Sequence, residues 1–88
     1  MKNILNNQSK LQWACRRGML ELDILLSNFL QEAYKDLELE DKAHFSALLQ
    51  HSDPELFSWL LGQAIPSDPG LLRIIERIRQ HARSRISN

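Results

Sequence analysis

An apolar stripe at helical spacing is the feature that most restricts what this chain can fold into. Within residues 20–35, apolar side chains recur at positions i, i+3, i+4, i+7, i+8 and i+11. This period puts them on one side of an α-helix, and a stripe this wide has to be covered by other helices. The residues of the stripe are Leu22, Leu25, Leu26, Phe29, Leu30 and Ala33.

Helix start and stop signals indicate which other segments can cover the stripe. Ser9 is a candidate N-cap, and Asp53-Pro54 and Asp68-Pro69 each join an N-cap residue to a proline suited to the first helical turn. Gly18 and Gly62 stand at positions where helices commonly end. The helices that we expect cover residues 9–17, 20–35, 40–50, 54–61 and 70–83.

These signals predict an all-α fold, a compact bundle of about five short helices. A chain of 88 residues has room for one domain, so we expect a single helical domain 1–88 with flexible ends at 1–8 and 84–88. No apolar run approaches the roughly 20 residues of a transmembrane helix. The first ten residues also lack the features of a secretion signal, and a lone cysteine fits a reducing compartment. We therefore expect a cytoplasmic protein.

The residues with reactive side chains form no recognisable catalytic or metal site. His44 and His51 could share a helix face, but no carboxylate or thiolate completes a metal-binding set, and we interpret both as structural or solvated, as we do His81. Cys15 stands beside two arginines that favour its thiolate, yet no base is placed to activate it, so we interpret it as a packing residue. We expect no catalytic residue, no metal and no stably bound cofactor.

Charge is unevenly distributed along this neutral chain, with basic ends and an acidic middle. The arginines of residues 71–88 suggest one alternative function, a basic C-terminal helix that binds nucleic acid. They equally fit the solvated face of a last helix, where positive charge favours the C-terminal dipole. Because no aromatic residues are interleaved with them, we expect no nucleic-acid partner.

The segment Arg16-Arg17-Gly18-Met19-Leu20-Glu21-Leu22-Asp23 places opposite charges around a glycine at a helix-to-helix junction. In one interpretation, Arg17 pairs with Glu21 across the turn, so the charges of the junction are paired within the protein. In the other, a rigid turn presents an arginine and a carboxylate to a partner. In both, the position of Gly18 after a helix predicts a positive φ angle. The residues alone favour neither interpretation.

This junction resembles the RGxxE signature of the succinate dehydrogenase flavinylation factors. The match extends over Trp13-x-Cys15-Arg16-Arg17-Gly18-Met19-x-Glu21-Leu22-Asp23. A second block, Asp53-Pro54-x-Leu56-Phe57-x-Trp59-Leu60, and Tyr34 also follow the bacterial pattern, so the resemblance covers about residues 10–66. Glu38 departs from it, because many bacterial relatives open the third helix with a serine cap. The tail beyond about Ile78 has no matching pattern.

The resemblance implies a specific function without catalytic residues. Members of this family are five-helix proteins that bind the flavoprotein subunit of succinate dehydrogenase, and often that of fumarate reductase. They promote covalent attachment of FAD to a histidine of that subunit, where the client forms the bond autocatalytically. FAD thus belongs to the client, and the factor's contribution is to hold histidine and flavin in near-attack geometry. Some bacterial members have instead been described as antitoxins of a membrane-associated toxin, which leaves an alternative partner.

The resemblance also implies which residues meet the partner. Arg17 and Glu21 would be charge-assisted hydrogen-bonding anchors, and Gly18 would allow close backbone approach. Trp13 and Trp59 are either further partner contacts or core residues. We expect the protein to be a monomer when free. The predicted partner-binding residues are Arg16, Arg17, Gly18, Met19, Glu21 and Asp23.

Overall fold

Short connections join the helices of this chain, and the computed structural model, which describes residues 8–87, contains no strand among them. The predicted all-α fold class is therefore confirmed. The elements are α1 Gln8–Cys15, α2 Leu20–Glu32, the 3₁₀ turn η2 Tyr34–Asp36, α3 Leu39–Leu48, α4 Asp53–Leu60 and α5 Pro69–Ser87. The predicted flexible N-terminal end lies outside the described residues except for Gln8. Among residues 8–87, no helix has both the length and the apolar character needed to cross a membrane.

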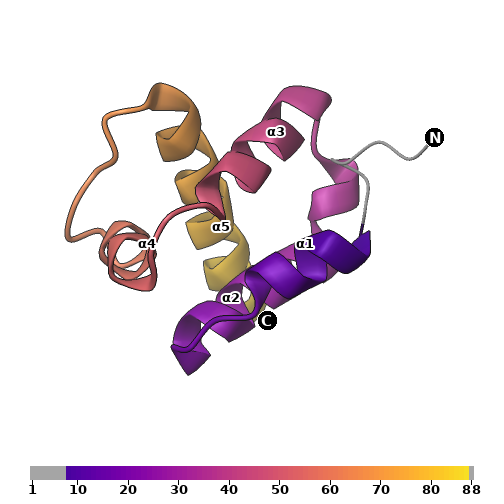
Figure 1. The fold of residues 1–88 in the computed structure, drawn as a ribbon, viewed down its shortest axis with the longest axis horizontal. Helices are drawn as coiled ribbons and strands as arrows, with labels where there is room; N and C mark the ends of the chain where they lie inside the picture. Colours follow the sequence, from indigo (N-terminus) through magenta and orange to yellow (C-terminus); the bar gives the residue numbers. More distant parts are fainter. Residues whose placement is uncertain (1–7, 88) are drawn as a thin grey trace.

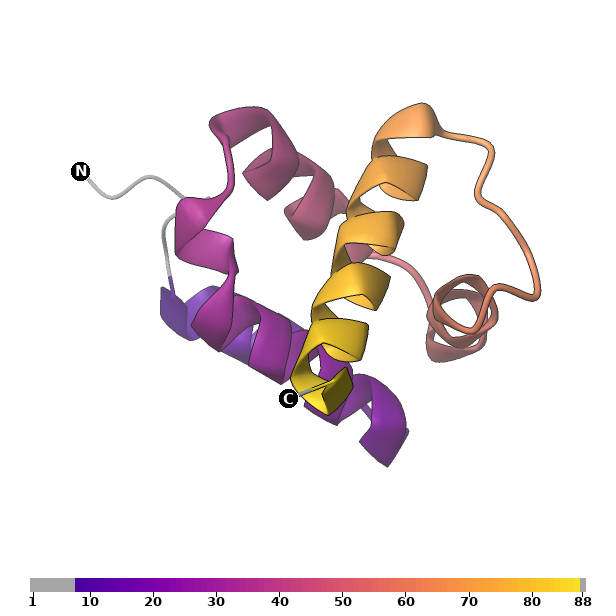
Figure 2. The same cartoon turned by 180° about the vertical axis from the view of Figure 1, so that it is seen from behind.

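Helix α5 is the element around which the others gather. It packs against α3, α2 and α4, while α1 packs chiefly against α2. Figure 1 shows α1 and α2 side by side along one edge, with α3 and α4 above them and α5 behind. The reverse view in Figure 2 brings α5 to the front, with α2 crossing below it. The α1–α2 connection is therefore at the periphery of the bundle, close to α4.

The predicted stripe of α2 forms the centre of the core. Leu22, Leu26, Phe29 and Leu30 are buried, and the remaining stripe residues are partly covered. The centre of the Phe29 ring lies 5.4 Å from that of Phe45 on α3, a separation typical of interacting aromatic pairs. Helix α5 completes the core with its own apolar stripe, Leu71, Ile74, Ile75 and Ile78.

The ends of the first two helices differ from those predicted. Ser9 lies inside α1 as its second residue, so it is not the N-cap, and α1 ends at Cys15 rather than Arg17. Helix α2 ends at Glu32 because Ala33, with φ −124°, leaves the helical conformation. The chain then makes a tight 3₁₀ turn that buries Tyr34 against Phe45, at 5.5 Å between ring centroids.

Helix α4 begins with a capping box rather than with the predicted Asp53 cap. The hydroxyl of Ser52 accepts a hydrogen bond from the backbone N–H of Glu55, and the Glu55 carboxylate accepts one from the Ser52 N–H. This reciprocal arrangement satisfies two N–H groups that a helix end otherwise leaves unpaired. Asp53 becomes the first residue of the helix, which leaves its carboxylate available for another partner.

Helix α5 starts where predicted but continues further. The Asp68 carboxylate accepts a 3.0 Å hydrogen bond from the Gly70 N–H, which confirms the capping signal. The helix runs to Ser87, beyond the expected end at Arg83. Several of its arginines have partners on other helices: Arg73 donates to the buried carboxylate of Asp41 at 2.9 Å, and Arg85 pairs with Glu32. These pairs fix α5 against α3 and α2.

Candidate functional site

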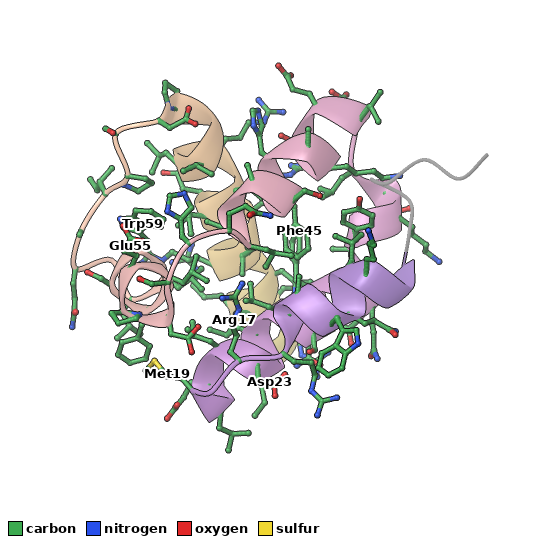
Figure 3. All side chains as sticks on the ribbon, in the orientation of Figure 1. Arg17, Met19, Asp23, Phe45, Glu55 and Trp59 are labelled. Carbon is green, nitrogen blue, oxygen red and sulfur yellow. The ribbon has the colours of Figure 1, made fainter. Side chains whose placement is uncertain are left out.

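Arg17 is the residue that ties the α1–α2 connection to the rest of the fold. One of its terminal nitrogens donates to the Leu49 carbonyl at 2.6 Å, and the other donates to the His51 carbonyl at 3.2 Å. The latter nitrogen also lies 3.3 Å from the carboxylate of Asp53. Only 12% of the Arg17 side chain is exposed. Figure 3 shows it reaching from the connection toward the loop that precedes α4.

This geometry decides against the interpretation in which Arg17 pairs with Glu21 across the turn. The carboxylate that meets Arg17 belongs to Asp53, in the second of the two sequence blocks. Glu21 is exposed in the first turn of α2, where a negative charge is favoured by the helix dipole. The two candidate anchors therefore differ in kind: Arg17 is held inside the protein, whereas Glu21 is free to meet a partner.

The prediction of a positive φ at Gly18 is wrong. The only glycine with positive φ in the described part of the chain is Gly62, at 80°. The connection turns without a left-handed residue because a backbone hydrogen bond from Arg16 to Trp13 closes the end of α1, and Met19 is extended. A Cβ at Gly18 would lie 3.7 Å from the nearest Asp53 carboxylate oxygen, which is an ordinary contact. Gly18 itself is exposed, so its backbone is accessible to a partner.

The outward side of the junction is a mixed apolar and charged surface. Trp13 is 76% exposed and Leu20 is 67% exposed, both unusually high for large apolar side chains. The guanidinium of Arg16 lies 6.0 Å from the centre of the Trp13 ring, at the limit of a cation–π contact. Beside them is a depression of about 400 Å³, lined in part by Ser27 and Leu30. Exposed apolar groups with charged neighbours are typical of a protein-binding surface.

Met19 and Asp23, also predicted as partner contacts, support the junction from within. Met19 packs against the core, and Figure 3 shows it pointing toward α4. Asp23 is half-buried and its carboxylate accepts a 3.3 Å hydrogen bond from the Ser27 hydroxyl. Trp59, on α4, also packs against the core, with its ring 5.0 Å from that of His51. Of the two tryptophans, Trp13 alone stands out into solvent.

The reactive side chains near the junction have structural surroundings. Cys15 is fully buried, its thiol faces the Leu26 carbonyl at 3.7 Å, and burial raises the pKa of the thiol to about 12 despite the opposing influence of Arg17. His51 pairs with Glu55, and His81 pairs with Glu32. No group of three or more His, Cys, Asp or Glu side chains within the described part is arranged to hold a metal ion.

Sequence reasoning missed three contributors to this region. Leu20 and Ile24 are exposed at 67% and 51%, and their i, i+4 spacing outside the buried stripe was the available signal. The local signals around Asp53 were interpreted as a helix cap, although the Ser52-x-x-Glu55 pattern predicts a capping box in which Ser52 is the cap and the Asp53 carboxylate can meet another partner.

The comparisons with known proteins agree with the resemblance. The family described as flavinator of succinate dehydrogenase matches residues 9–82. The chain belongs to this family. Among curated flavinator relatives, the FAD assembly factor SdhE of Shewanella oneidensis is 47% identical over 89% of this chain and 95% of its own length. That of Serratia is 41% identical over 92% of both chains.

The fold is shared as well. The solution structure of a UPF0350 protein is 34% identical and superposes with a TM-score of 0.79, covering 98% of this chain and 92% of the other. The matched family region includes the whole junction, the Asp53 block and most of α5. The arginine-rich helix is therefore a part of the flavinator fold and not an appended tail.

Proposed function

We propose that this chain binds the flavoprotein subunit of succinate dehydrogenase through the α1–α2 junction and promotes covalent attachment of FAD to that subunit. Family membership supports the reaction, and the single structural observation that supports the site is the group of exposed side chains in and next to the RGxxE signature. That group comprises Trp13, Arg16, Leu20 and Glu21. Arg17 acts beneath it, as the clamp that holds the connection in place.

Positioning is the contribution that this surface can make. Covalent attachment requires a client histidine to meet the flavin at reacting distance and in the right orientation. Well-oriented groups react with effective molarities of roughly 10⁵ M or more, so holding the client in that geometry accelerates the step without any acid, base or nucleophile from the helper. The buried Cys15 and the paired His51 and His81 are consistent with a helper of this kind.

Glu21 is the residue that separates binding from folding most cleanly. It is exposed and takes part in no ion pair among the described residues, so its removal costs the fold only the dipole interaction of about 0.3–1 kcal/mol. Buried against a partner cation, its loss leaves that cation unpaired and costs about 2–5 kcal/mol of binding free energy. The flavoprotein subunit of fumarate reductase is the second proposed client, and its binding to the Glu21 variant can be measured in the same way.

The experiment is to co-express the flavoprotein subunit with wild-type, Glu21→Ala or Glu76→Ala protein in cells without their own assembly factor. In-gel flavin fluorescence then measures covalent FAD, and a pull-down measures the complex. Glu76 is an exposed carboxylate on α5 and provides the matched control. We expect Glu21→Ala to lower both signals and Glu76→Ala to leave them unchanged. Wild-type protein that neither binds the subunit nor raises its covalent flavin would contradict the proposal.

A further inference from the structure

A groove of apolar side chains lies where α2, α4 and α5 meet. Its volume is about 390 Å³, and its lining includes Leu25, Leu60, Leu61 and Ile78, with Arg79 and Arg83 as the charged members and no acidic residue. A smaller apolar depression of about 190 Å³ adjoins it, because Leu25 and Ala82 line both. Together they form one surface, here called the α5 groove. Helix α5, which supplies part of the lining of both depressions, is at the front in Figure 2.

The α5 groove is continuous with the junction surface. On α2, Ile24 follows Leu20 by one helical turn, and Leu25 follows Glu21 in the same way, so the exposed face of the helix leads from the junction into the groove. Ile24 is itself 51% exposed and lines the smaller depression. A partner seated on Leu20 and Glu21 is therefore next to the groove.

The arginines of α5 differ in whether their charge already has an ion-pair partner within the protein. Arg73 and Arg77 face Asp41, at 2.9 and 3.6 Å, and Arg85, which lines the smaller depression, is already paired with Glu32. Arg79 has no ion pair among the described residues. It lies against Gly62, where a Cβ would come within 3.1 Å of its guanidinium, so the glycine leaves room for the arginine at the groove.

We propose that the α5 groove extends the client-binding surface and receives a segment of the flavoprotein subunit that combines apolar side chains with flanking carboxylates. This inference rests on the proposed function. An apolar floor with a charged rim is the usual anatomy of a protein interface, and the rim here complements acidic side chains. Nucleic acid would contact the arginines but leave the apolar floor uncovered, so a protein segment fits this surface better.

The test measures the affinity of the purified flavoprotein subunit for wild-type protein and for two groove variants, Leu61→Glu and Arg83→Glu. Matched controls are Ile65→Glu, at an apolar position 72% exposed outside the groove lining, and Lys35→Glu, at an exposed cation on η2. We expect each groove variant to bind roughly tenfold or more weakly, and both controls to bind like wild type. Arg83→Lys keeps the charge and should retain most of the affinity.

The outcomes separate this inference from the proposed function. If Arg83→Glu binds the subunit like wild type while Glu21→Ala does not, the groove inference is overturned and the junction stands. If wild-type protein does not bind the subunit, both are overturned. Arg83 is exposed on α5, so its variant decides the matter even if Leu61→Glu unfolds. Binding of each protein to a labelled single-stranded RNA is measured as well. If Arg83→Glu loses affinity for the RNA but keeps its affinity for the flavoprotein subunit, the arginines serve nucleic acid and the inference is overturned.

Discussion

The guanidinium of Arg17 donates a 2.6 Å hydrogen bond to the backbone carbonyl of Leu49, 32 positions further along the chain. Leu49 is the C-cap residue that directly follows α3, and a helix C-terminus presents carbonyls that need donors. The signature arginine therefore closes the end of α3 and fixes the α1–α2 connection in one step. Its structural role stands beside any role at the partner interface.

Replacing Arg17 by alanine should destabilise the fold. The change removes donors to two carbonyls and an ion partner of Asp53, and we expect a loss of about 1–3 kcal/mol in the free energy of unfolding. Arg16→Ala is the matched control, because its side chain is exposed and its cation–π contact is worth only about 0.5–1 kcal/mol. Chemical unfolding of both variants checks this. Equal unfolding midpoints for Arg17→Ala and Arg16→Ala would contradict a structural role for the Arg17 contacts.

Substituting alanine at Gly18 should leave stability nearly unchanged. The new Cβ would have an ordinary 3.7 Å contact and the backbone is not left-handed, so we expect a change within about 0.5 kcal/mol. If Gly18→Ala remains folded but no longer supports covalent flavin on the client, the glycine serves close approach of the partner.

Gly62→Ala should destabilise the fold more than Gly18→Ala, because Gly62 has a left-handed backbone conformation. There φ is 80° and the added Cβ would come within 3.1 Å of Arg79, so a loss of about 1–2 kcal/mol is expected. Thermal unfolding measures both glycine variants under the same conditions. A larger loss at Gly18 than at Gly62 would contradict this ordering.

Much of the fold follows from patterns that one helix carries by itself. The stripe of Leu22, Leu26 and Phe29 and the Asp68-Pro69 start are local signals, and the structure confirms them. The candidate site was located by the resemblance, because Arg16-Arg17-Gly18 between two helices is compatible with both a closed and an open junction.

The remainder depended on contacts between distant segments. The preference of Arg17 for Asp53 over Glu21 is decided by how α4 is placed beside the junction, and no spacing within residues 16–23 contains that information. Asp41 lies in the acidic middle of the chain, where nothing local predicts burial, yet it is 1% exposed because arginines of α5 reach it. Burial of a charge becomes predictable only when its partner's position is known.

The Asp41 carboxylate should contribute measurably to stability. Asp41→Ala removes the anchor of Arg73 and Arg77 at the α3–α5 contact, although both arginines then regain water, so we expect a loss of about 1–3 kcal/mol. Glu40→Ala, on the exposed side of the same helical turn, is the control and should have little effect. Urea unfolding of the pair would refute this prediction if Glu40→Ala were the more damaging change.

Stability should decline in acid in part through Glu32. The hydrogen bond from Arg85, with help from His81, holds the pKa of Glu32 below its ordinary value of 4.5. A carboxylate whose pKa is lower in the folded state stabilises the fold above the unfolded-state pKa, and this stabilisation is lost as pH falls through the folded-state pKa. Glu32→Gln should therefore flatten the dependence of unfolding free energy on pH below about pH 4.5.

The control for this pH dependence is Glu76→Gln, which removes an exposed carboxylate from α5. Its pH profile should follow that of wild type. An acid-side slope that Glu32→Gln leaves intact would show that the carboxylate and Arg85 are not coupled in solution.

Cys15 should be inert toward thiol reagents in the native protein. It is fully buried, and a pKa of about 12 leaves almost no thiolate at neutral pH. A colorimetric disulfide reagent should react slowly with folded protein and at once in denaturant, where the ordinary thiol pKa returns. Rapid reaction with the folded chain would contradict the burial of Cys15 and, with it, the close packing of α1 on α2.

Because α1 packs chiefly against α2 at the edge of the molecule, we expect it to open as a separate cooperative unit. Such a unit opens at a lower free energy than the elements it rests on, so its backbone amides exchange with deuterium earlier than those of the central α5. Trp13 lies on α1 and Arg16 follows its last residue. A partner that covers both must slow this exchange, so the protection of the α1 amides reports on occupancy of the junction in solution.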